Sequence, residues 1–181
     1  MIAVVGDAHL VTDDPRLDLA HQLGKALIDS KYRLLCGGKG GVMNAAAVGA
    51  STSSRYQSGD TVALLPEDDA DFASDSMDIV IPTGLGLARN ALVARADALV
   101  AVGGGAGTLS EMCFGWQFGK LVIAMRVEGW SGRIADSPID QRKRFQAIPD
   151  DQVWGANLPS DVITLLDQKL GLYIESRRAT R

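Results

Sequence analysis

The residues with the clearest chemical potential form the segment Gly103-Gly104-Gly105-Ala106-Gly107-Thr108-Leu109-Ser110-Glu111. This segment follows an apolar run and leads into a helical pattern. Glycine lets backbone N–H groups approach an anion closely, and the N-terminus of a helix adds partial positive charge. A tight turn needs fewer than four glycines. We therefore predict a phosphate site at Gly103, Gly104, Gly105, Gly107 and Thr108.

This segment matches neither of the common phosphate-binding motifs. If Gly103 and Gly105 are the first two positions of G-x-G-x-x-G, then Thr108 stands where the last glycine belongs. The pattern G-x-x-x-x-G-K-[ST] does not occur in the sequence. The sequence therefore disfavours both a nicotinamide dinucleotide ligand and nucleotide hydrolysis by a P-loop.

Glu111 has two interpretations. Thr108 and Glu111 have the T-x-x-E spacing of a capping box, in which the glutamate bonds back to the N–H of the cap residue. Alternatively, the carboxylate of Glu111 belongs to the ligand site, where it stabilises positive charge at a sugar carbon or transfers a proton. The motif alone leaves both interpretations open.

A second glycine segment is Gly84-Leu85-Gly86-Leu87-Ala88-Arg89-Asn90, which lies between a strand pattern and a helical pattern. The planar guanidinium of Arg89 can hold a phosphate through two parallel hydrogen bonds. A cation in the first turn of a helix opposes the helix dipole, which favours a functional role over a surface role. Gly84, Gly86, Arg89 and Asn90 are therefore candidate ligand-binding residues.

A third glycine segment follows the second strand pattern and contains Gly37, Gly38, Lys39, Gly40 and Gly41. We expect its glycines to cradle a sugar or a base, and Lys39 to reach an anion. A glycine-rich turn with a solvated lysine is an equally good interpretation. Near the end of the first strand pattern, Gly6 is a further candidate and Asp7 and His9 lie beside it, although a histidine without a paired carboxylate is weak evidence for ligand contact.

Several other polar and aromatic residues are better explained without a ligand. An acidic stretch is most often a solvated loop, and we expect this one to point away from the phosphate site: Glu67, Asp68, Asp69, Asp71 and Asp75. Trp130 is either an ordinary packed tryptophan or a lid over a planar ring. Cys36 and Cys113 lack the spacing of a metal or redox pair, so we expect reduced, buried thiols and no protein-bound metal.

The elements that position these residues alternate along the chain. Apolar runs predict strands over residues 2–5, 33–36, 61–65, 79–81, 98–102 and 121–125. Helical patterns cover residues 15–29, 42–50, 87–96, the stretch from the end of Gly103–Gly107 to about Gly119, and 159–170. Residues 126–149 resemble a long, partly ordered loop. This alternation predicts a three-layer α/β fold of the Rossmann-like type, a parallel sheet with helices on both faces, whose strand-to-helix loops converge at one edge.

Size and composition set the remaining limits. The chain has 181 residues, a length that predicts a single domain. We expect this domain to span residues 1–175 and to be followed by a frayed tail at residues 176–181. Its net charge of −4 disfavours nucleic acid as a partner. The sequence carries no signal-peptide pattern and no apolar run long enough to span a membrane. Together with the reduced thiols, these features predict a cytoplasmic protein.

The glycine motifs resemble those of a known superfamily. Residues 103–111 are similar to the P-G-G-x-G-T-x-x-E motif of the LONELY GUY, or lysine decarboxylase-like (SLOG), superfamily, and residues 37–50 resemble its second glycine segment. The segment from Gly84 to Asn90, with Gly129-Trp130 and Asp140-Gln141-Arg142 downstream, resembles the branch that contains the molybdenum cofactor carrier proteins. The resemblance covers roughly residues 1–170.

The resemblance implies two activities. The carrier branch implies a protein that binds a phosphorylated, nucleotide-like or pterin ligand of the molybdenum cofactor type. The LONELY GUY enzymes imply a phosphoribohydrolase that releases a base from a nucleoside 5′-monophosphate, with Arg89 and Glu111 as catalytic residues. Those enzymes have arginine-lysine where this chain has Arg89-Asn90, and proline in place of Gly103. Both branches imply a homodimer or homotetramer, and a module that only senses a nucleotide is a third possibility.

Overall fold

The computed structural model describes residues 1–179, and within them seven parallel strands form one sheet in the order β4-β3-β2-β1-β5-β6-β7. The strands are β1 (Ile2–Gly6), β2 (Leu34–Cys36), β3 (Thr61–Leu65), β4 (Ile79–Pro82), β5 (Ala98–Val102), β6 (Leu121–Met125) and β7 (Trp154–Ala156). Every residue of β5 and β6 is buried, as expected for central parallel strands that are covered on both faces. The predicted α/β fold is confirmed.

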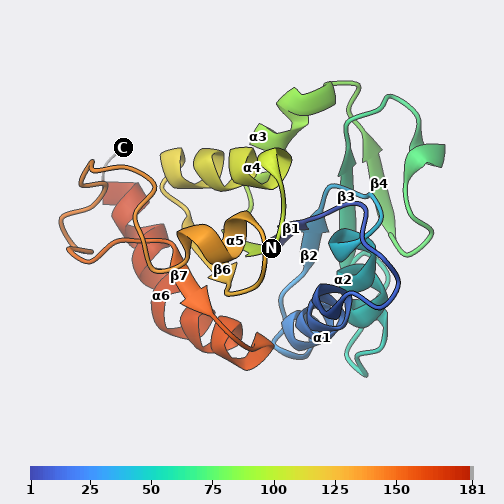
Figure 1. Cartoon of the computed structure of the whole chain (residues 1–181), viewed down its shortest axis with the longest axis horizontal. Helices are drawn as coiled ribbons and strands as arrows, with labels where there is room; N and C mark the ends of the chain where they lie inside the picture. The colour runs from blue at the N-terminus through green and yellow to red at the C-terminus, as the bar shows by residue number, and fades with distance from the viewer. Residues whose placement is uncertain (180–181) are drawn as a thin grey trace.

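Helices cover both faces of the sheet, as Figure 1 shows. The α-helices are α1 (Pro15–Asp29), α2 (Val42–Ser51), α3 (Asn90–Val93), α4 (Ala106–Gln117), α5 (Trp130–Ile134) and α6 (Pro159–Ala179), and the 3₁₀ turns are η1 (Ala70–Phe72) and η2 (Gly86–Arg89). Helices α1, α2 and α6 enclose one hydrophobic core with Ile2, Val4 and Val100, whereas α3 and α4 enclose the other with Ala3 and Val5. The alternation of side chains along β1 therefore supplies both cores.

Helix α1 begins where its sequence predicts. The carboxylate of Asp14 accepts the backbone N–H of Arg16 at 2.9 Å, and Pro15 occupies the first helical position. Helix α1 then packs directly on α2, because Gly24 and Gly49 have no side chains there. A Cβ on either glycine would lie 1.8 Å from a backbone oxygen of the other helix. The small residues of α2 thus allow its close packing against α1.

The third predicted helix is shorter than expected. Residues 87–96 form the end of η2 and the single turn of α3 rather than one continuous helix. Ile79 and Ile81 of β4 pair with Val62 and Leu64, whose side chains lie on the α3 side of the sheet. Because α3 is short, Ile79 and Ile81 stay 43% and 44% exposed. The edge of this face is therefore apolar and open.

The C-terminal third departs most from the prediction. The segment at 126–149 contains α5, and β7 follows it as an additional strand. Helix α6 runs to Ala179, past the predicted end near residue 170, so residues 176–179 are helical where a frayed tail was predicted. Residues 180–181 of that predicted tail lie outside the described residues. No helix within residues 1–179 is long and apolar enough to cross a membrane.

Candidate functional site

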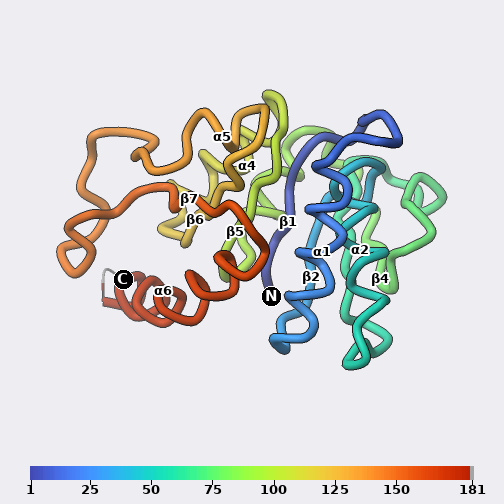
Figure 2. The backbone as a smooth tube through the Cα atoms, turned by 60° about the horizontal axis from the view of Figure 1, so that its bottom comes forward, coloured from blue at the N-terminus to red at the C-terminus, as the bar shows by residue number. Residues whose placement is uncertain are grey.

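The predicted ligand residues lie where the strands end. Because the strands are parallel, the segments that follow β1, β2, β3 and β5 meet at the carboxyl edge of the sheet, which lies along the top of Figure 2. The backbone carbonyl of Asp7 accepts the N–H of Val42 at 2.9 Å and thereby joins the end of β1 to the start of α2. Gly41 has a φ of 60° and leaves room for this contact, since a Cβ there would lie 2.1 Å from the Asp7 oxygen.

Arg89 and Glu111 form a buried ion pair at this edge. Nη1 of Arg89 donates to Oε1 of Glu111 at 3.0 Å, and the two side chains are only 9% and 7% exposed. The guanidinium lies against Gly37, where a Cβ would be 2.7 Å from Nη1. Within the described residues, Nε of Arg89 is buried and has no hydrogen-bond partner. The pair therefore joins residues from three segments and leaves donors of Arg89 available.

The capping-box interpretation of Glu111 is wrong. Helix α4 begins at Ala106 with Gly105 as its N-cap, and no side chain caps it. Thr108 is therefore the third helical residue, and Glu111 lies almost one turn further along. Its carboxylate reaches Arg89 instead of the helix N-terminus. The capping box fails because the glycine segment starts the helix two residues before Thr108.

Burial sets the protonation behaviour of Glu111. The loss of hydration raises the pKa of its carboxyl to about 7, and the charge of Arg89 opposes this rise. A carboxyl with a pKa near neutrality can hold or release a proton under ordinary conditions. Glu111 is thus chemically distinct from the exposed acids of this chain.

Lys39 and Glu67 form a second ion pair close to the first. Nζ of Lys39 donates to Oε1 of Glu67 at 2.5 Å, and this bond lowers the pKa of the Glu67 carboxyl. The other carboxylate oxygen of Glu67 is buried and has no partner within the described residues. The prediction that the acidic stretch points away is therefore wrong for Glu67, although its other members are exposed: Asp68, Asp69, Asp71 and Asp75.

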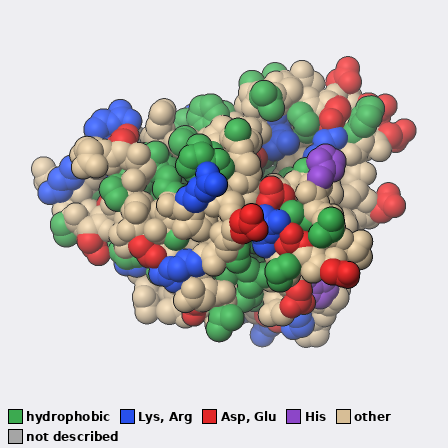
Figure 3. All heavy atoms as spheres, in the orientation of Figure 1, with side chains coloured by type: hydrophobic (Ala, Val, Ile, Leu, Met, Phe, Trp, Pro, Cys, Tyr) green, Lys and Arg blue, Asp and Glu red, His purple; other side chains and the backbone are tan. Residues whose placement is uncertain are grey.

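Two of the predicted phosphate-binding amides are already occupied. The N–H of Gly103 donates to Oγ of Ser131 at 2.8 Å, and the N–H of Gly104 donates to Oδ2 of Asp7 at 2.8 Å. The same Asp7 oxygen accepts a hydrogen bond from Arg16 at 2.9 Å. Figure 3 views this edge face-on, with acidic and basic side chains intermingled near its middle. These two amides are therefore engaged within the protein, and a role of Gly103 and Gly104 in phosphate binding stays a prediction.

The first turn of α4 is more accessible. Gly105 and Gly107 are exposed, and within the described residues a methyl group on either would meet no atom within 4 Å. The amides of a first helical turn have no intrahelical acceptor. Nδ2 of Asn90 donates to Oγ of Ser110 at 2.7 Å, which links α3 to α4 beside this turn. Gly105, Gly107 and buried Thr108 thus form an open helix N-terminus next to the Arg89–Glu111 pair.

Comparison with known proteins places this arrangement in a family. The family model described as "SLOG cluster4 family" matches residues 1–154. The chain belongs to the SLOG cluster4 family. An uncharacterized protein from Archaeoglobus fulgidus is 35% identical over 142 residues, which cover 76% of this chain and 88% of that protein.

Two solved structures similar to this family member carry informative descriptions. The molybdenum cofactor binding protein from Rippkaea orientalis has a TM-score of 0.72 and 31% identity, over 92% of this chain and 93% of that one. The molybdenum cofactor carrier protein from Chlamydomonas reinhardtii has a TM-score of 0.73 and 30% identity, over 94% and 98% of the two chains. These neighbours support the carrier-like branch of the superfamily that the glycine motifs indicated.

The Arg89–Glu111 and Lys39–Glu67 ion pairs form a charged cluster, and the remaining candidates of this SLOG chain lie at the same edge beside it. Gly6 is closely packed, because a Cβ there would lie 2.4 Å from the carbonyl of Val102, and one on Gly40 would lie 2.9 Å from the carbonyl of Ala8. Gly84 and Gly86, which are exposed just before and at the start of η2, have positive φ angles of 63° and 53°. These four glycines thus shape the backbone, and their role in ligand binding stays a prediction.

The histidine, tryptophan and cysteine candidates differ in how far they are buried. His9 is exposed, and half-buried Trp130 donates its backbone N–H to the carbonyl of Gly104. Cys36 is buried, which raises the pKa of its thiol to about 12, but Cys113 is only partly buried. Among residues 1–179, no group of three histidine, cysteine or acidic side chains is placed to hold a metal ion.

Sequence reasoning missed the roles of Arg16 and Glu67 and underestimated Asp7. The sequence gives a signal for Asp7, since it ends a buried strand beside a predicted glycine site. It gives no comparable signal for Arg16, whose guanidinium reaches back from α1 to Asp7 and Asp14. Glu67 was missed because it begins an acidic run, and such a run predicts a solvated loop.

Proposed function

We propose that this chain is a carrier that holds a phosphorylated pterin of the molybdenum cofactor type at the carboxyl edge of its sheet. The observation that carries the proposal is the Arg89 guanidinium, which is buried, fixed by Glu111 and supported by Gly37. Its Nε lacks a partner within residues 1–179. A buried, pre-oriented guanidinium with spare donors suits a phosphate, which it can contact through two parallel hydrogen bonds.

The rest of the edge fits the two parts of such a ligand. The open N-terminus of α4, at Gly105 and Gly107, offers backbone amides and partial positive charge to a phosphate. A pterin ring carries amino and ring N–H donors, and the unpartnered oxygen of Glu67 is a buried acceptor. The descriptions of the two similar structures support this ligand class. The bound cofactor would contribute its own metal chemistry as cargo, and the chain's residues would bind and shield it.

Titration of the purified protein with a phosphorylated pterin, followed by isothermal calorimetry, tests the proposal. We expect stoichiometric binding that Arg89→Ala weakens at least tenfold, because charge-assisted hydrogen bonds contribute about 1.5–3 kcal/mol. Arg55→Ala is the matched control, since this exposed arginine lies outside the cluster. Equal binding by wild type and Arg89→Ala would refute the role of the guanidinium. Circular dichroism confirms that each variant is folded.

A second candidate function is supported by the Glu111 carboxyl. A buried carboxyl with a pKa of about 7 beside an arginine suits acid–base chemistry at a sugar carbon, as in a nucleoside 5′-monophosphate phosphoribohydrolase. Asn90 and Gly103 depart from the motif of those enzymes. Incubation with a panel of nucleoside 5′-monophosphates and chromatography of the free base distinguishes the two functions. Base release by wild type but not by folded Glu111→Gln would establish the hydrolase, whereas no release favours the carrier.

We also propose that the chain forms a homo-oligomer, a dimer or tetramer, through the open apolar edge. Ile79 and Ile81 of β4 are exposed there, and Leu87 in the η2 turn that follows β4 is 83% exposed. Contiguous exposed apolar side chains commonly mark interfaces. Light scattering of wild type and Ile81→Lys tests this assignment. A monomeric wild type would refute it, and a size that changes with the ligand would favour the sensor interpretation.

A further inference from the structure

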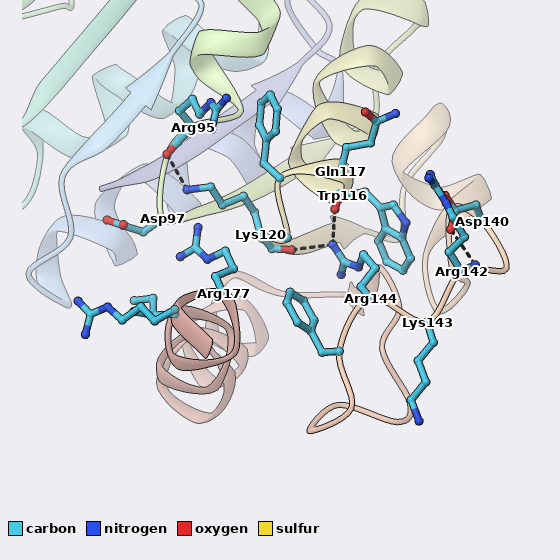
Figure 4. A pocket seen from close by; sticks show the side chains of 15 residues that line it. Arg95, Asp97, Trp116, Gln117, Lys120, Asp140, Arg142, Lys143, Arg144 and Arg177 are labelled. Atoms are coloured by element: carbon cyan, nitrogen blue, oxygen red, sulfur yellow. Dashed lines mark hydrogen bonds and ion pairs between the residues drawn. The ribbon is translucent and has the colours of Figure 1, made fainter. Parts of the chain in front are cut away.

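The opposite edge of the sheet carries a cavity that the proposed function does not use. It has a volume of about 780 Å³ and is bounded by the starts of β5 and β6, the end of α4, residues 140–145 and the end of α6. Figure 4 shows side chains from these elements around it. Since the glycine segments follow the strands and this cavity precedes them, the two sites lie at different edges.

The cavity has a strongly positive lining. Among the described residues, seven basic side chains and two acidic ones line it. The whole chain has only 18 lysines and arginines, and its net charge is −4. One of the two acids, Asp140, is already paired with Arg142 at the rim. A concentration of cations in an acidic protein indicates attraction of an anion to this one place.

Two of these cations are held in fixed positions. The guanidinium of Arg95 lies 3.8 Å from the centre of the Phe118 ring, and Nζ of Lys120 donates to the backbone carbonyl of Arg95 at 2.7 Å. Lys120 is more than nine-tenths buried. Arg177 reaches from α6 to the start of β6, where a Cβ on Gly119 would lie 3.0 Å from its Cγ (Figure 4). Cations from three different elements thus line one cavity, with little side-chain entropy left to lose at Arg95 and Lys120.

A separate buried pair makes the wall beside them rigid. Arg144 pairs with Asp151 through both carboxylate oxygens, at 2.6 and 2.7 Å, and lies 3.5 Å from the centre of the Trp116 ring. Its Nη1 also donates to the carbonyl of Trp116 at 2.7 Å. Arg144 therefore stabilises the wall of the cavity, and its guanidinium is engaged by Asp151 and Trp116 rather than directed to a ligand.

We propose that this basic cavity binds a small molecule that carries a pyrophosphate group, such as a nucleoside diphosphate. The volume lies in the range of small-molecule sites, which are typically about 300–1,000 Å³. Arg95, Lys120 and Arg177 come from different elements that line the cavity, so they suit an anion with charge spread over more than one phosphate. A volume of this size suits a small molecule better than a nucleic acid strand or an acidic protein segment.

Calorimetric titration with inorganic pyrophosphate and with ADP tests the proposal. We expect both to bind the wild type, and Arg95→Gln to weaken both at least tenfold. Arg178→Ala, which removes an exposed rim cation, should weaken both less and keeps the test valid if Arg95→Gln does not fold. Arg33→Ala is the matched control, because this 63% exposed side chain lies at the same sheet edge outside the cavity.

Arg89→Ala separates this site from the proposed pterin site. We expect that variant to bind pyrophosphate and ADP as the wild type does, whatever it does to the pterin. The proposal is overturned if the wild type binds neither probe, if Arg33→Ala weakens binding as much as Arg95→Gln does, or if only Arg89→Ala abolishes it. The proposal would also be overturned if the wild type bound single-stranded DNA or an acidic peptide but bound neither pyrophosphate nor ADP.

Discussion

The buried carboxyl of Glu111 gives a prediction about stability and pH. Its pKa in the folded protein is about 7, against 4.5 for the ordinary group, because burial penalises the charged form. Between pH 4.5 and 7, the folded state therefore holds a proton that the unfolded state has released. Stability then decreases as the pH rises through this window. At about 1.4 kcal/mol for each pKa unit, the contribution of Glu111 amounts to about 3 kcal/mol.

Glu111→Gln removes this titration while it keeps the size and polarity of the side chain. Urea unfolding of both proteins at intervals from pH 4.5 to 8 gives the free energy of unfolding at each pH. We expect the difference, wild type minus variant, to decrease by about 3 kcal/mol between pH 4.5 and 7 and to level off above 7. Other titrating groups contribute equally to both proteins and cancel in the difference.

A flat difference would mean that Glu111 has an ordinary pKa. A difference that increases with pH would mean that Arg89 stabilises the carboxylate more than burial destabilises it. Either result refutes the reasoning. Glu67→Gln is the matched control, because Lys39 lowers the pKa of the Glu67 carboxyl. The stability that Glu67 provides is present above pH 4.5 and is lost only below it, so its difference should stay flat across the same window.

Three glycine substitutions test the packing. Gly37→Ala places a Cβ 2.7 Å from Nη1 of Arg89, so we expect at least tenfold weaker pterin binding with a normal circular dichroism spectrum. Gly24→Ala places a Cβ 1.8 Å from the backbone oxygen of Ala46, and because backbone cannot rotate away, we expect a loss of about 3 kcal/mol in urea unfolding. Gly171→Ala, in α6 with no atom of the described residues within 4 Å of the new Cβ, should instead add about 0.5–1 kcal/mol. Gly24→Ala and Gly171→Ala are chemically identical changes, so opposite effects on the free energy of unfolding would be due to packing. Equal effects of the two substitutions would contradict this explanation.

The strands and the convergence of their loops could be predicted because they depend on local patterns. Short apolar runs bounded by glycine or proline marked six strands, and parallel pairing follows from their alternation with helices. Strand β7 was missed because Trp-Gly-Ala has no strand periodicity and is held by its pairing with β6. Helix α6 was predicted too short, because the polar sequence of its last turns is typical of a frayed tail.

The site was less predictable because its decisive contacts are not local. The bond between Arg89 and Glu111 joins residues 22 positions apart. Nothing in T-x-x-E reveals whether the helix begins before or after the threonine, and Gly105 decides this. The same limit applies to Glu67, which a lysine from another loop turns inward. The sequence therefore indicated which edge carries the candidate site but not which side chains form its charged cluster.

The position of β1 in the middle of the sheet has a consequence for how the chain folds. Its partners are β2 and β5, and Ile2 pairs with Ala98. The sheet is therefore completed only when two regions distant in sequence meet, and contacts of this kind slow folding. The half from β1 to β4 can collapse first around α1 and α2, but it exposes the edge of β1 until β5 docks. We expect slow refolding with a phase in which that unpaired edge promotes aggregation, most strongly at high protein concentration.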